Sequence, residues 1–580
     1  MQELDQKIAE EKRRLETVEN PDTTNLNQLR QQREELIGQV IPLEHIRFAQ
    51  IQELVDERTA ILQWYIFGDC FRAFIITRNN QQPIIWQSSL QNVKDLQNWK
   101  DKYLETYTTE KPHWRYKLAT ELSKLAEILH INDILNLIPS PCQALILVPH
   151  RYLHLLPLHA LPVSGEGESY LLDKFPGGVR YAPSCQLLKL ATSGNPSLLP
   201  TRKSFPLLTK ESQCVAGVPP VVAPGVRDAR QGRVRFPLLG NERDARQGRV
   251  RFPTNATRKS FPLPSSHKDA RQRRVRFPTN ATGKSFPLLN KESQCVAGVP
   301  PVVAPGVRDA RQGRVRFPGE ESRSLFAIQD PNENLTYTEI EVETIERDFH
   351  PTTVIEKSNA TKQALLQAES FSHAQVVHFS CHGYFDINSP VDSAIALAGC
   401  VSVIPADADS GDSTVNSNQR YRKLANGNAI DLEKCLTLPD IFNLSLPECR
   451  LVTLSACETG LTSPNSTSDE YIGLPSGFLK AGSSSIVSSL WSVDDLATTL
   501  LMIRFYDNQD SLPIAQALCQ AQCWLRDSTQ AEIIQWTQKH SKINEQHKHT
   551  ILQCLQEWYQ PEHKPFRKPE SWAGFCAIGC

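Results

Sequence analysis

Short apolar runs alternate with amphipathic stretches along two long parts of the chain. In the first part, four runs of five to eight residues are rich in apolar residues and bounded by turn residues, which is typical of strands. These runs are Ala60–Phe67, Phe71–Thr77, Pro83–Gln87 and Ala144–Pro149. Gly68-Asp69 predicts a hairpin turn between the first two, and leucines at helical spacing from Leu118 to Leu129 predict a helix before the fourth.

Strand and helix signals alternate again in the second part, from residue 324 onward. The runs that predict strands are Leu325–Ile328, Thr353–Ile355, Val376–Ser380, Leu451–Ser455 and Ser485–Leu490. Amphipathic stretches at Tyr337–Phe349 and Thr361–Ala368 predict helices between the first three. This alternation predicts an α/β fold with a mostly parallel sheet flanked by helices on both faces.

Two other segments have different patterns. Residues 1–45 are rich in Glu, Gln, Lys and Arg, and their apolar residues recur near helical multiples on both sides of Asn20-Pro21-Asp22. We interpret this segment as a helical hairpin broken by a turn. The stretch between Cys400 and Asp431 is rich in Asp, Ser and Asn, which predicts an exposed loop.

A repetitive tract interrupts the two parts. The string Asp-Ala-Arg-Gln-(Gly/Arg)-Arg-Val-Arg-Phe-Pro occurs four times, starting at Asp228, Asp244, Asp269 and Asp309, without the fixed period that a solenoid requires. Residues 201–318 hold 24 Lys and Arg against 7 Asp and Glu, so they carry +17 and the rest of the chain −18. A tract so rich in Pro and Arg buries little apolar area, and we expect it to be disordered. The alternative is a nucleic-acid-binding arm that uses Arg with interleaved Phe.

Composition and charge argue against membrane proteins, secreted proteins and strongly charged chains. The chain has 580 residues and a formal net charge of −1, so it is neither strongly basic nor strongly acidic as a whole. It has no run of about 18 apolar residues, and its start shows no signal-peptide core, so we expect neither a membrane span nor secretion. The 15 cysteines are odd in number and scattered, which favours reduced thiols in a cytoplasm.

Candidate chemistry lies just past two of the predicted strands. Val376–Ser380 leads into Cys381-His382-Gly383, and Leu451–Ser455 leads into Ala456-Cys457. In parallel α/β sheets the ligand crevice lies at the carboxyl ends of the strands, so His382 and Cys457 can meet there. A Cys paired with a His forms an activated thiolate nucleophile, and the glycine after the His lets backbone N–H groups approach a substrate carbonyl oxygen.

The same residues also have structural interpretations. A Cys at a strand end is more often a small core residue than a nucleophile. His378 fits a core histidine, and Cys381 neighbours His382 but should face away from it. No set of His and Cys has zinc-like spacing, so we expect no metal site, and we interpret the pairs Cys519/Cys523 and Cys576/Cys580 as core thiols.

Several motifs in order make the chain resemble a known family. They are Leu147-Val148-Pro149-His150, Leu155-Leu156-Pro157-Leu158-His159-Ala160-Leu161, Tyr181-Ala182-Pro183-Ser184, His382-Gly383, Ser455-Ala456-Cys457-Glu458-Thr459-Gly460, Ser489-Leu490-Trp491-Ser492-Val493-Asp494-Asp495 and Trp572-Ala573-Gly574-Phe575-Cys576-Ala577-Ile578-Gly579. Together they resemble the CHAT domain, a bacterial branch of the caspase-like cysteine peptidases that also includes separases and gingipains. The resemblance covers residues 46–190 and 324–580.

The resemblance implies a caspase-like α/β sandwich with a specific domain order. Residues 46–190 would be a degenerate, supporting lobe without catalytic residues. Residues 191–323 would be the repetitive insert, and residues 324–580 the catalytic part. We expect no full array of the helical repeats that often precede this domain in the family, because about 45 residues come before it in this sequence.

The resemblance also implies roles for individual residues. His382 and Cys457 would form the catalytic dyad, and the backbone N–H groups of Gly383 and Cys457 an oxyanion hole. The segment Ser489–Asp495 would form a wall of the substrate pocket, with Ser489, Trp491, Asp494 and Asp495 as its candidate lining. Either aspartate could receive a basic side chain, or it could cap the helix that starts at Leu496.

The function expected from these residues is that of a cysteine endopeptidase that hydrolyses peptide bonds of protein substrates. It needs no cofactor, and we expect a protein substrate and a regulatory protein partner but no membrane. Nucleic acid would bind only through the basic insert. The alternative is a catalytically silent caspase-like scaffold for protein–protein contacts.

Overall fold

The computed structural model describes residues 45–164, 168–193, 323–385, 392–403, 421–423, 428–457, 459–461 and 473–580, together with isolated helical positions before residue 33. The repetitive tract, predicted to be disordered, lies outside the described residues. So does most of the predicted helical hairpin, of which residues 24–29 are helical.

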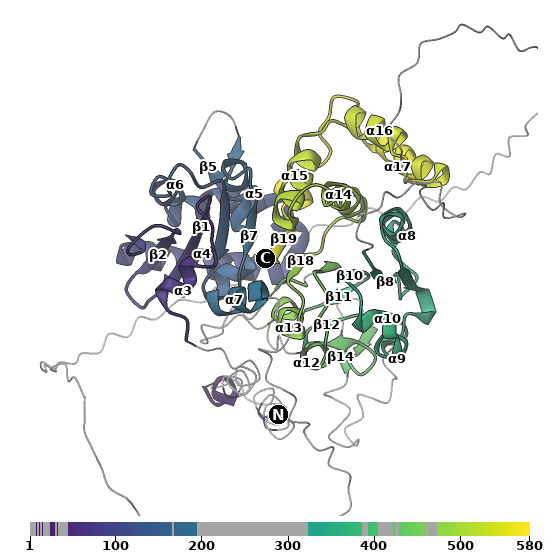
Figure 1. Ribbon diagram of the computed structural model, residues 1–580, viewed down its shortest axis with the longest axis horizontal. Coiled ribbons are helices and arrows are strands. Elements are labelled where there is room, and N and C mark those ends of the chain that lie inside the picture. Colours follow the sequence, from purple (N-terminus) through teal and green to yellow (C-terminus); the bar gives the residue numbers. More distant parts are fainter. Residues whose placement is uncertain are drawn as a thin grey trace, which may run out of the picture. The chain divides into compact units, whose positions relative to one another are not determined.

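An eleven-stranded, mostly parallel sheet forms the centre of the fold (Figure 1). Its order is β3-β2-β1-β4-β7-β19-β18-β17-β10-β8-β9. The strands are β1 (Thr59–Ile66), β2 (Phe71–Ile76), β3 (Ile84–Gln87), β4 (Ala144–Val148), β7 (Val179–Tyr181), β8 (Leu325–Gln329), β9 (Thr352–Glu356), β10 (Val376–Ser380), β17 (Leu451–Ser455), β18 (Ser485–Ser489) and β19 (Phe575–Gly579). The predicted α/β class with a mostly parallel sheet is confirmed, as is the hairpin β1–β2.

The sheet is continuous across the two predicted parts of the domain. β19 pairs in parallel with β7 of the first part and antiparallel with β18 of the second. On the other side of β18, strands β17, β10, β8 and β9 are all parallel. β8, β10, β17, β18 and β19 are buried at every position, which agrees with their continuous apolar runs.

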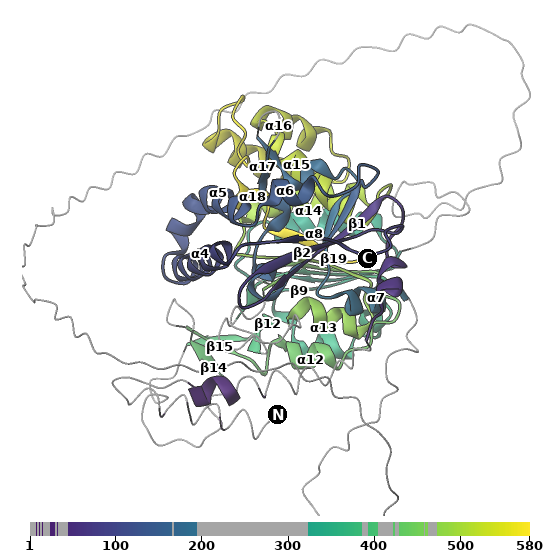
Figure 2. The same ribbon diagram turned by 90° about the vertical axis from the view of Figure 1, so that its left-hand side faces the viewer.

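Helices cover both faces of the sheet (Figure 2). On one side lie α4 (Leu90–Thr109), α5 (Lys111–Ile128), α6 (Ile131–Leu135), α14 (Asp495–Asn508), α15 (Ile514–Asp527), α16 (Gln530–Lys539), α17 (Glu545–Trp558) and α18 (Pro569–Trp572). On the other lie α7 (Cys185–Ser193), α12 (Leu438–Phe442) and α13 (Leu474–Ala481). The remaining helices are α3 (Phe48–Gln52), α8 (Thr338–Ile345), α9 (Lys362–Gln367) and α10 (Glu369–Ser372).

Small sheets follow the carboxyl end of β10. β11 (Gly383–Tyr384), β12 (Ala394–Ile395) and β16 (Leu436–Thr437) form one, and β13 (Val401–Val403), β14 (Tyr421–Lys423) and β15 (Asn428–Asp431) form another. The described ends of the stretch between Cys400 and Asp431 are thus strands instead of the predicted loop, although Val401 and Tyr421 are exposed as predicted. Ala429 and Ile430 are buried there, and Ile430 packs against the apolar residues near β12.

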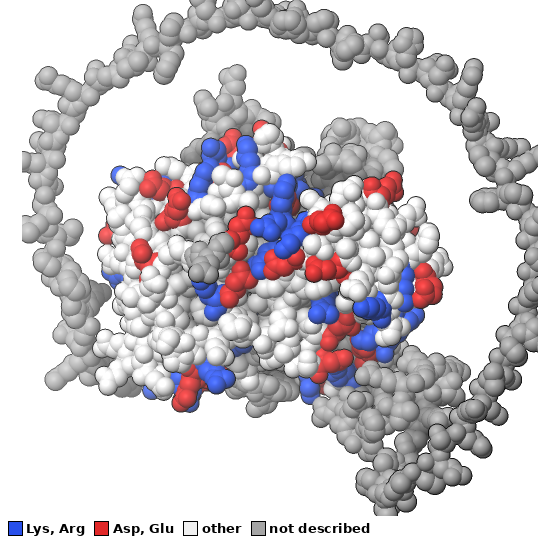
Figure 3. Space-filling model, turned by 90° about the horizontal axis from the view of Figure 1, so that it is seen from above, with Lys and Arg blue, Asp and Glu red and all other residues white. Residues whose placement is uncertain are grey.

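The described surface carries charges of both signs. Lys and Arg are interspersed with Asp and Glu over the described face seen in Figure 3. Within the described residues, every helix is too short or too polar to cross a membrane.

Candidate active site

Two parallel neighbouring strands bring His382 and Cys457 together. β10 pairs with β17 in the register Val376 to Leu451 through Ser380 to Ser455, and each candidate residue follows its strand by two positions. Both residues line one pocket with a volume of about 270 Å³. The 75 residues that separate them in sequence are thus bridged by one pair of adjacent strands.

Cys457 is half-buried at the edge of this pocket. Its Sγ lies 3.3 Å from the hydroxyl oxygen of Ser492, which follows β18 on the next strand of the sheet. Cys381 lies differently: its side chain is buried, and burial raises the pKa of its thiol. A thiolate therefore forms at Cys381 only with difficulty, although Cys381 also lines the pocket that holds His382 and Cys457, contrary to the expectation that it faces away.

His382 is held by a side chain that follows a third parallel strand, β8. Its Nε2 lies 2.7 Å from Oδ1 of Asn334. Because an amide oxygen can only accept, Nε2 carries the proton and Nδ1 is left unprotonated, able to take a proton from a thiol. Burial lowers the pKa of His382, so the ring is neutral at pH 7, as a general base must be.

The loop that carries Asn334 is itself anchored to the sheet. The Asp330 carboxylate accepts hydrogen bonds from the backbone N–H groups of Asn334 (3.1 Å) and Leu335 (3.3 Å). The N–H of Asp330 donates to the carbonyl of Ser380 at the end of β10 (2.9 Å). The position of Asn334 relative to His382 is therefore fixed through β10, the strand that precedes His382.

Gly383 packs directly against the backbone of Cys457. A Cβ placed on Gly383 would lie 2.1 Å from the carbonyl oxygen of Cys457, far inside van der Waals contact. Only glycine allows the two loops to approach this closely. The two residues expected to form the oxyanion hole are thus adjacent in space.

The active-site pocket has an acidic and hydroxyl-rich wall. Asp495 and Glu341 both line it. Burial raises the pKa of Asp495, and the nearby carboxylate of Asp494 raises it further. The hydroxyls of Ser380 and Thr498 also line the pocket, and both are buried without a hydrogen-bond partner among the described residues.

Behind this wall, His378 forms a buried pair with Glu341. Its Nε2 lies 2.8 Å from Oε1 of Glu341, and its Nδ1 lies 3.1 Å from the hydroxyl of Tyr506. The side chains of His378 and Glu341 are 1% and 2% exposed. His378 is therefore a buried, hydrogen-bonded histidine that positions Glu341.

The segment after β18 divides the expected substrate pocket in two. Asp495 lines the pocket with His382 and Cys457, whereas Trp491 and Asp494 line a second pocket of about 490 Å³. Asp494 also caps α14, since its Oδ1 accepts from the N–H of Ala497 (2.9 Å). Ser489 is fully buried and donates its hydroxyl to the carbonyl of Ala456 beneath the site, outside both pockets.

The residues missed by the sequence analysis are Asn334, Glu341, Ser380 and Thr498. The sequence did offer a signal for Asn334. A predicted strand leads into the polar run Asp330-Pro331-Asn332-Glu333-Asn334, just as predicted strands lead into the His and Cys motifs. Glu341 offered no such signal, since an acidic residue in a helix is usually solvated.

One group of side chains that could ligate a metal occurs in the described part of the chain. It consists of Glu339, Glu343 and His547 and contains none of the cysteines considered above.

The family model of the CHAT domain matches residues 120–580, which is most of the chain. The chain belongs to the CHAT domain family. No curated protein matches it. Among solved structures it is similar to gingipain R, described as an Arg-specific cysteine proteinase, at 6% identity and a TM-score of 0.24. That alignment covers 44% of this chain and 46% of gingipain R.

In this CHAT-domain protein, the candidate site is formed by three consecutive parallel strands. β8 supplies Asn334, β10 supplies His382 and Gly383, and β17 supplies Cys457. All three loops leave the same edge of the sheet, where ligand sites of parallel sheets lie.

Proposed function

We propose that this CHAT-domain protein is a cysteine endopeptidase with His382 and Cys457 as its catalytic dyad. The observation that carries the proposal is the pocket past β10 and β17 that His382 and Cys457 share, with Asn334 Oδ1 beside it at 2.7 Å from Nε2 of His382. We regard the silent scaffold as the competing function.

The reaction follows from the roles of the two side chains. His382 takes the thiol proton of Cys457, and the sulfur attacks the carbonyl carbon of the scissile bond. The backbone N–H groups of Gly383 and Cys457 donate to the resulting oxyanion. The C–N bond then breaks, the amine leaves with the proton held by His382, and a thioester remains. Water activated by His382 hydrolyses the thioester and restores the Cys457 thiol.

We further propose that the active-site pocket takes a Lys or Arg side chain before the cleaved bond. Asp495 is its main anchor, and the carboxylates of Glu341 and Asp330 raise the pKa of Asp495 further by repulsion. A bound cation relieves this repulsion. The unpartnered hydroxyls of Ser380 and Thr498 offer acceptors for guanidinium N–H groups. Asp494 is not part of this anchor, because it caps α14 and faces the second pocket.

An electrophilic Arg-containing peptide probe tests the dyad. We expect it to label Cys457 in the wild type, as located by mass mapping, and not in His382→Ala. The matched control is Cys381→Ala, which removes the neighbouring buried thiol and should label normally. A folded protein in which Cys457 stays unlabelled, or labels equally without His382, would favour the scaffold.

Cleavage of matched peptides tests the acidic pocket. We expect Arg peptides to be cleaved at least about tenfold faster than Ala peptides. Asp495→Asn should remove most of this difference, and Asp494→Asn should retain it. Equal rates for Arg and Ala peptides in the wild type would contradict the role of Asp495 while leaving the dyad intact.

A further inference from the structure

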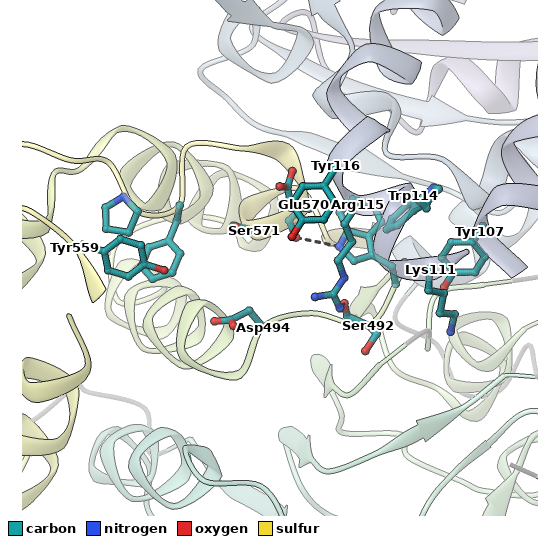
Figure 4. A pocket seen from close by; sticks show the side chains of 13 residues that line it. Tyr107, Lys111, Trp114, Arg115, Tyr116, Ser492, Asp494, Tyr559, Glu570 and Ser571 are labelled. Atoms are coloured by element: carbon teal, nitrogen blue, oxygen red, sulfur yellow. Dashed lines mark hydrogen bonds between the residues drawn. The ribbon is translucent and has the colours of Figure 1, made fainter. Parts of the chain in front are cut away.

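The second pocket lies beside the candidate nucleophile, on the other side of the segment that follows β18. Its volume is about 490 Å³, larger than that of the active-site pocket. Three separate parts of the described chain form its walls: the end of α4 with the start of α5, the segment from Trp491 to Asp494, and the segment from Tyr559 to Ser571. Figure 4 shows Arg115 reaching toward Ser492, with Trp114 and Tyr107 beside it and Tyr559 across the pocket.

The two pockets share one residue, Ser492. Its hydroxyl lies 3.3 Å from Sγ of Cys457, so the boundary between the pockets lies at the candidate nucleophile. Along the segment, Asp494 faces one pocket and Asp495 the other. Consecutive side chains of an extended peptide also point to opposite sides. A substrate lying along this segment with one side chain in the active-site pocket therefore directs a neighbouring side chain into the second pocket.

Aromatic rings dominate the second pocket. Its aromatic lining consists of Tyr107, Trp114, Tyr116, Trp491, Tyr559 and Phe566. The rings of Trp114 and Trp491 meet edge to face, with centroids 5.5 Å apart, and those of Tyr107 and Trp114 do so at 5.0 Å. Aromatic side chains prefer these arrangements, and another ring entering the pocket can extend them.

The charged groups of the pocket are balanced and already engaged. Arg115 donates to the carbonyl of Ser492, and Lys111 lies over the ring of Tyr107 at 5.1 Å. Asp494 caps α14, and the half-buried Glu570 lies within electrostatic range of Arg115. Two cations and two carboxylates leave no charge excess for a charged side chain to neutralise. The pocket therefore favours a neutral aromatic side chain over a charged one.

We propose that this pocket is a second side-chain subsite, which binds an aromatic residue adjacent to the basic residue at the cleaved bond. The inference rests on the proposed peptidase function and extends it to the neighbouring substrate position. The preferred substrate class is then a protein segment with an Arg or Lys next to a Phe, Tyr or Trp. Arg115 acts as a positioning residue, because it holds the carbonyl of Ser492 and with it the wall between the two subsites.

The test is a peptide series with a fixed Arg and with Phe, Ala, Asp or Lys placed in turn on each side of it. We expect Phe at one of these positions to raise kcat/KM at least about tenfold over Ala, Asp and Lys. Tyr559→Ala and Tyr116→Ala each remove part of the pocket wall and should reduce the ratio of Phe-peptide to Ala-peptide kcat/KM several-fold. Tyr116 is 78% exposed, so its replacement does not endanger folding.

Trp558→Ala is the matched control. Trp558 is also aromatic, precedes Tyr559 and is 63% exposed, but it does not line the pocket, so the preference should persist in this variant. Equal cleavage of the Phe and Ala peptides, or an unchanged preference in both tyrosine variants, would overturn the subsite alone. Failure to cleave any peptide, together with an unlabelled Cys457, would overturn the peptidase and the subsite with it.

Discussion

Replacing Asn334 is the most direct test of how the site is built. Asn334→Ala removes the 2.7 Å hydrogen bond to Nε2 of His382 and leaves the ring free to rotate and to change tautomer. A hydrogen bond to a neutral partner contributes about 0.5–1.5 kcal/mol, and the loss of orientation at a catalytic base adds to this. With about 1.4 kcal/mol per factor of ten, we expect kcat to fall roughly tenfold to a hundredfold with a smaller effect on KM.

Asn334→Asp changes the charge while keeping the shape. Burial lowers the pKa of His382, so in the wild type the base stays unprotonated to a lower pH than an ordinary histidine does. A carboxylate beside Nε2 favours the protonated ring and raises that pKa. The acidic limb of the kcat/KM profile should therefore move to higher pH in Asn334→Asp, whereas a purely structural role for Asn334 would leave the limb in place.

The assay is hydrolysis of a fluorogenic Arg peptide between pH 5 and pH 9, with wild type and variants at equal concentrations of folded protein. Asn332→Ala is the control, because Asn332 lies in the same loop and its amide contacts Cys400 (3.8 Å) instead of His382. The reasoning is refuted if Asn334→Ala retains wild-type kcat, or if Asn334→Asp has an unshifted profile.

Three further outcomes follow from the geometry. Gly383→Ala should abolish peptide cleavage, because the added Cβ would meet the Cys457 carbonyl at 2.1 Å; a fully active variant would show that the loops need not approach so closely. Asp494→Ala should lower the free energy of unfolding in urea by about 1 kcal/mol through loss of the α14 cap, and Asp494→Asn by much less; equal losses would contradict the cap. Iodoacetamide should modify Cys457 in the native protein and Cys381 only after denaturation, since burial raises the pKa of Cys381; mass mapping that finds Cys381 modified first would reverse the assignment of the nucleophile.

The sequence predicted the strands that carry the candidate site better than it predicted which side chains line the two pockets. The runs Val376–Ser380 and Leu451–Ser455 match β10 and β17 exactly at both ends, because continuous burial leaves an unbroken apolar signal. The adjacency of His382 and Cys457 followed from the rule for parallel strands. The partition of Asp494 and Asp495 between two pockets could not be predicted, because it depends on the path of five residues between β18 and α14.

The contacts that distant helices make near the site could not be predicted from the sequence either. Tyr107, Trp114 and Arg115 reach the site region from α4 and α5, which precede Cys457 by more than 300 residues. Their helical pattern predicts a buried face without saying which part of the chain covers it. The pairing of His378 with Glu341 likewise depends on how α8 packs over β10.

The position of β19 also has a consequence for biosynthesis. This strand is the last of the eleven to be synthesised, yet among the described strands it alone joins β7 to β18. During translation the strands on either side can form, but they cannot join until residues 575–579 have left the ribosome. The second pocket also depends on late residues, including Phe566 and Glu570. A nascent chain that has not yet released residues 566–579 therefore lacks both this link in the sheet and part of the wall of the second pocket.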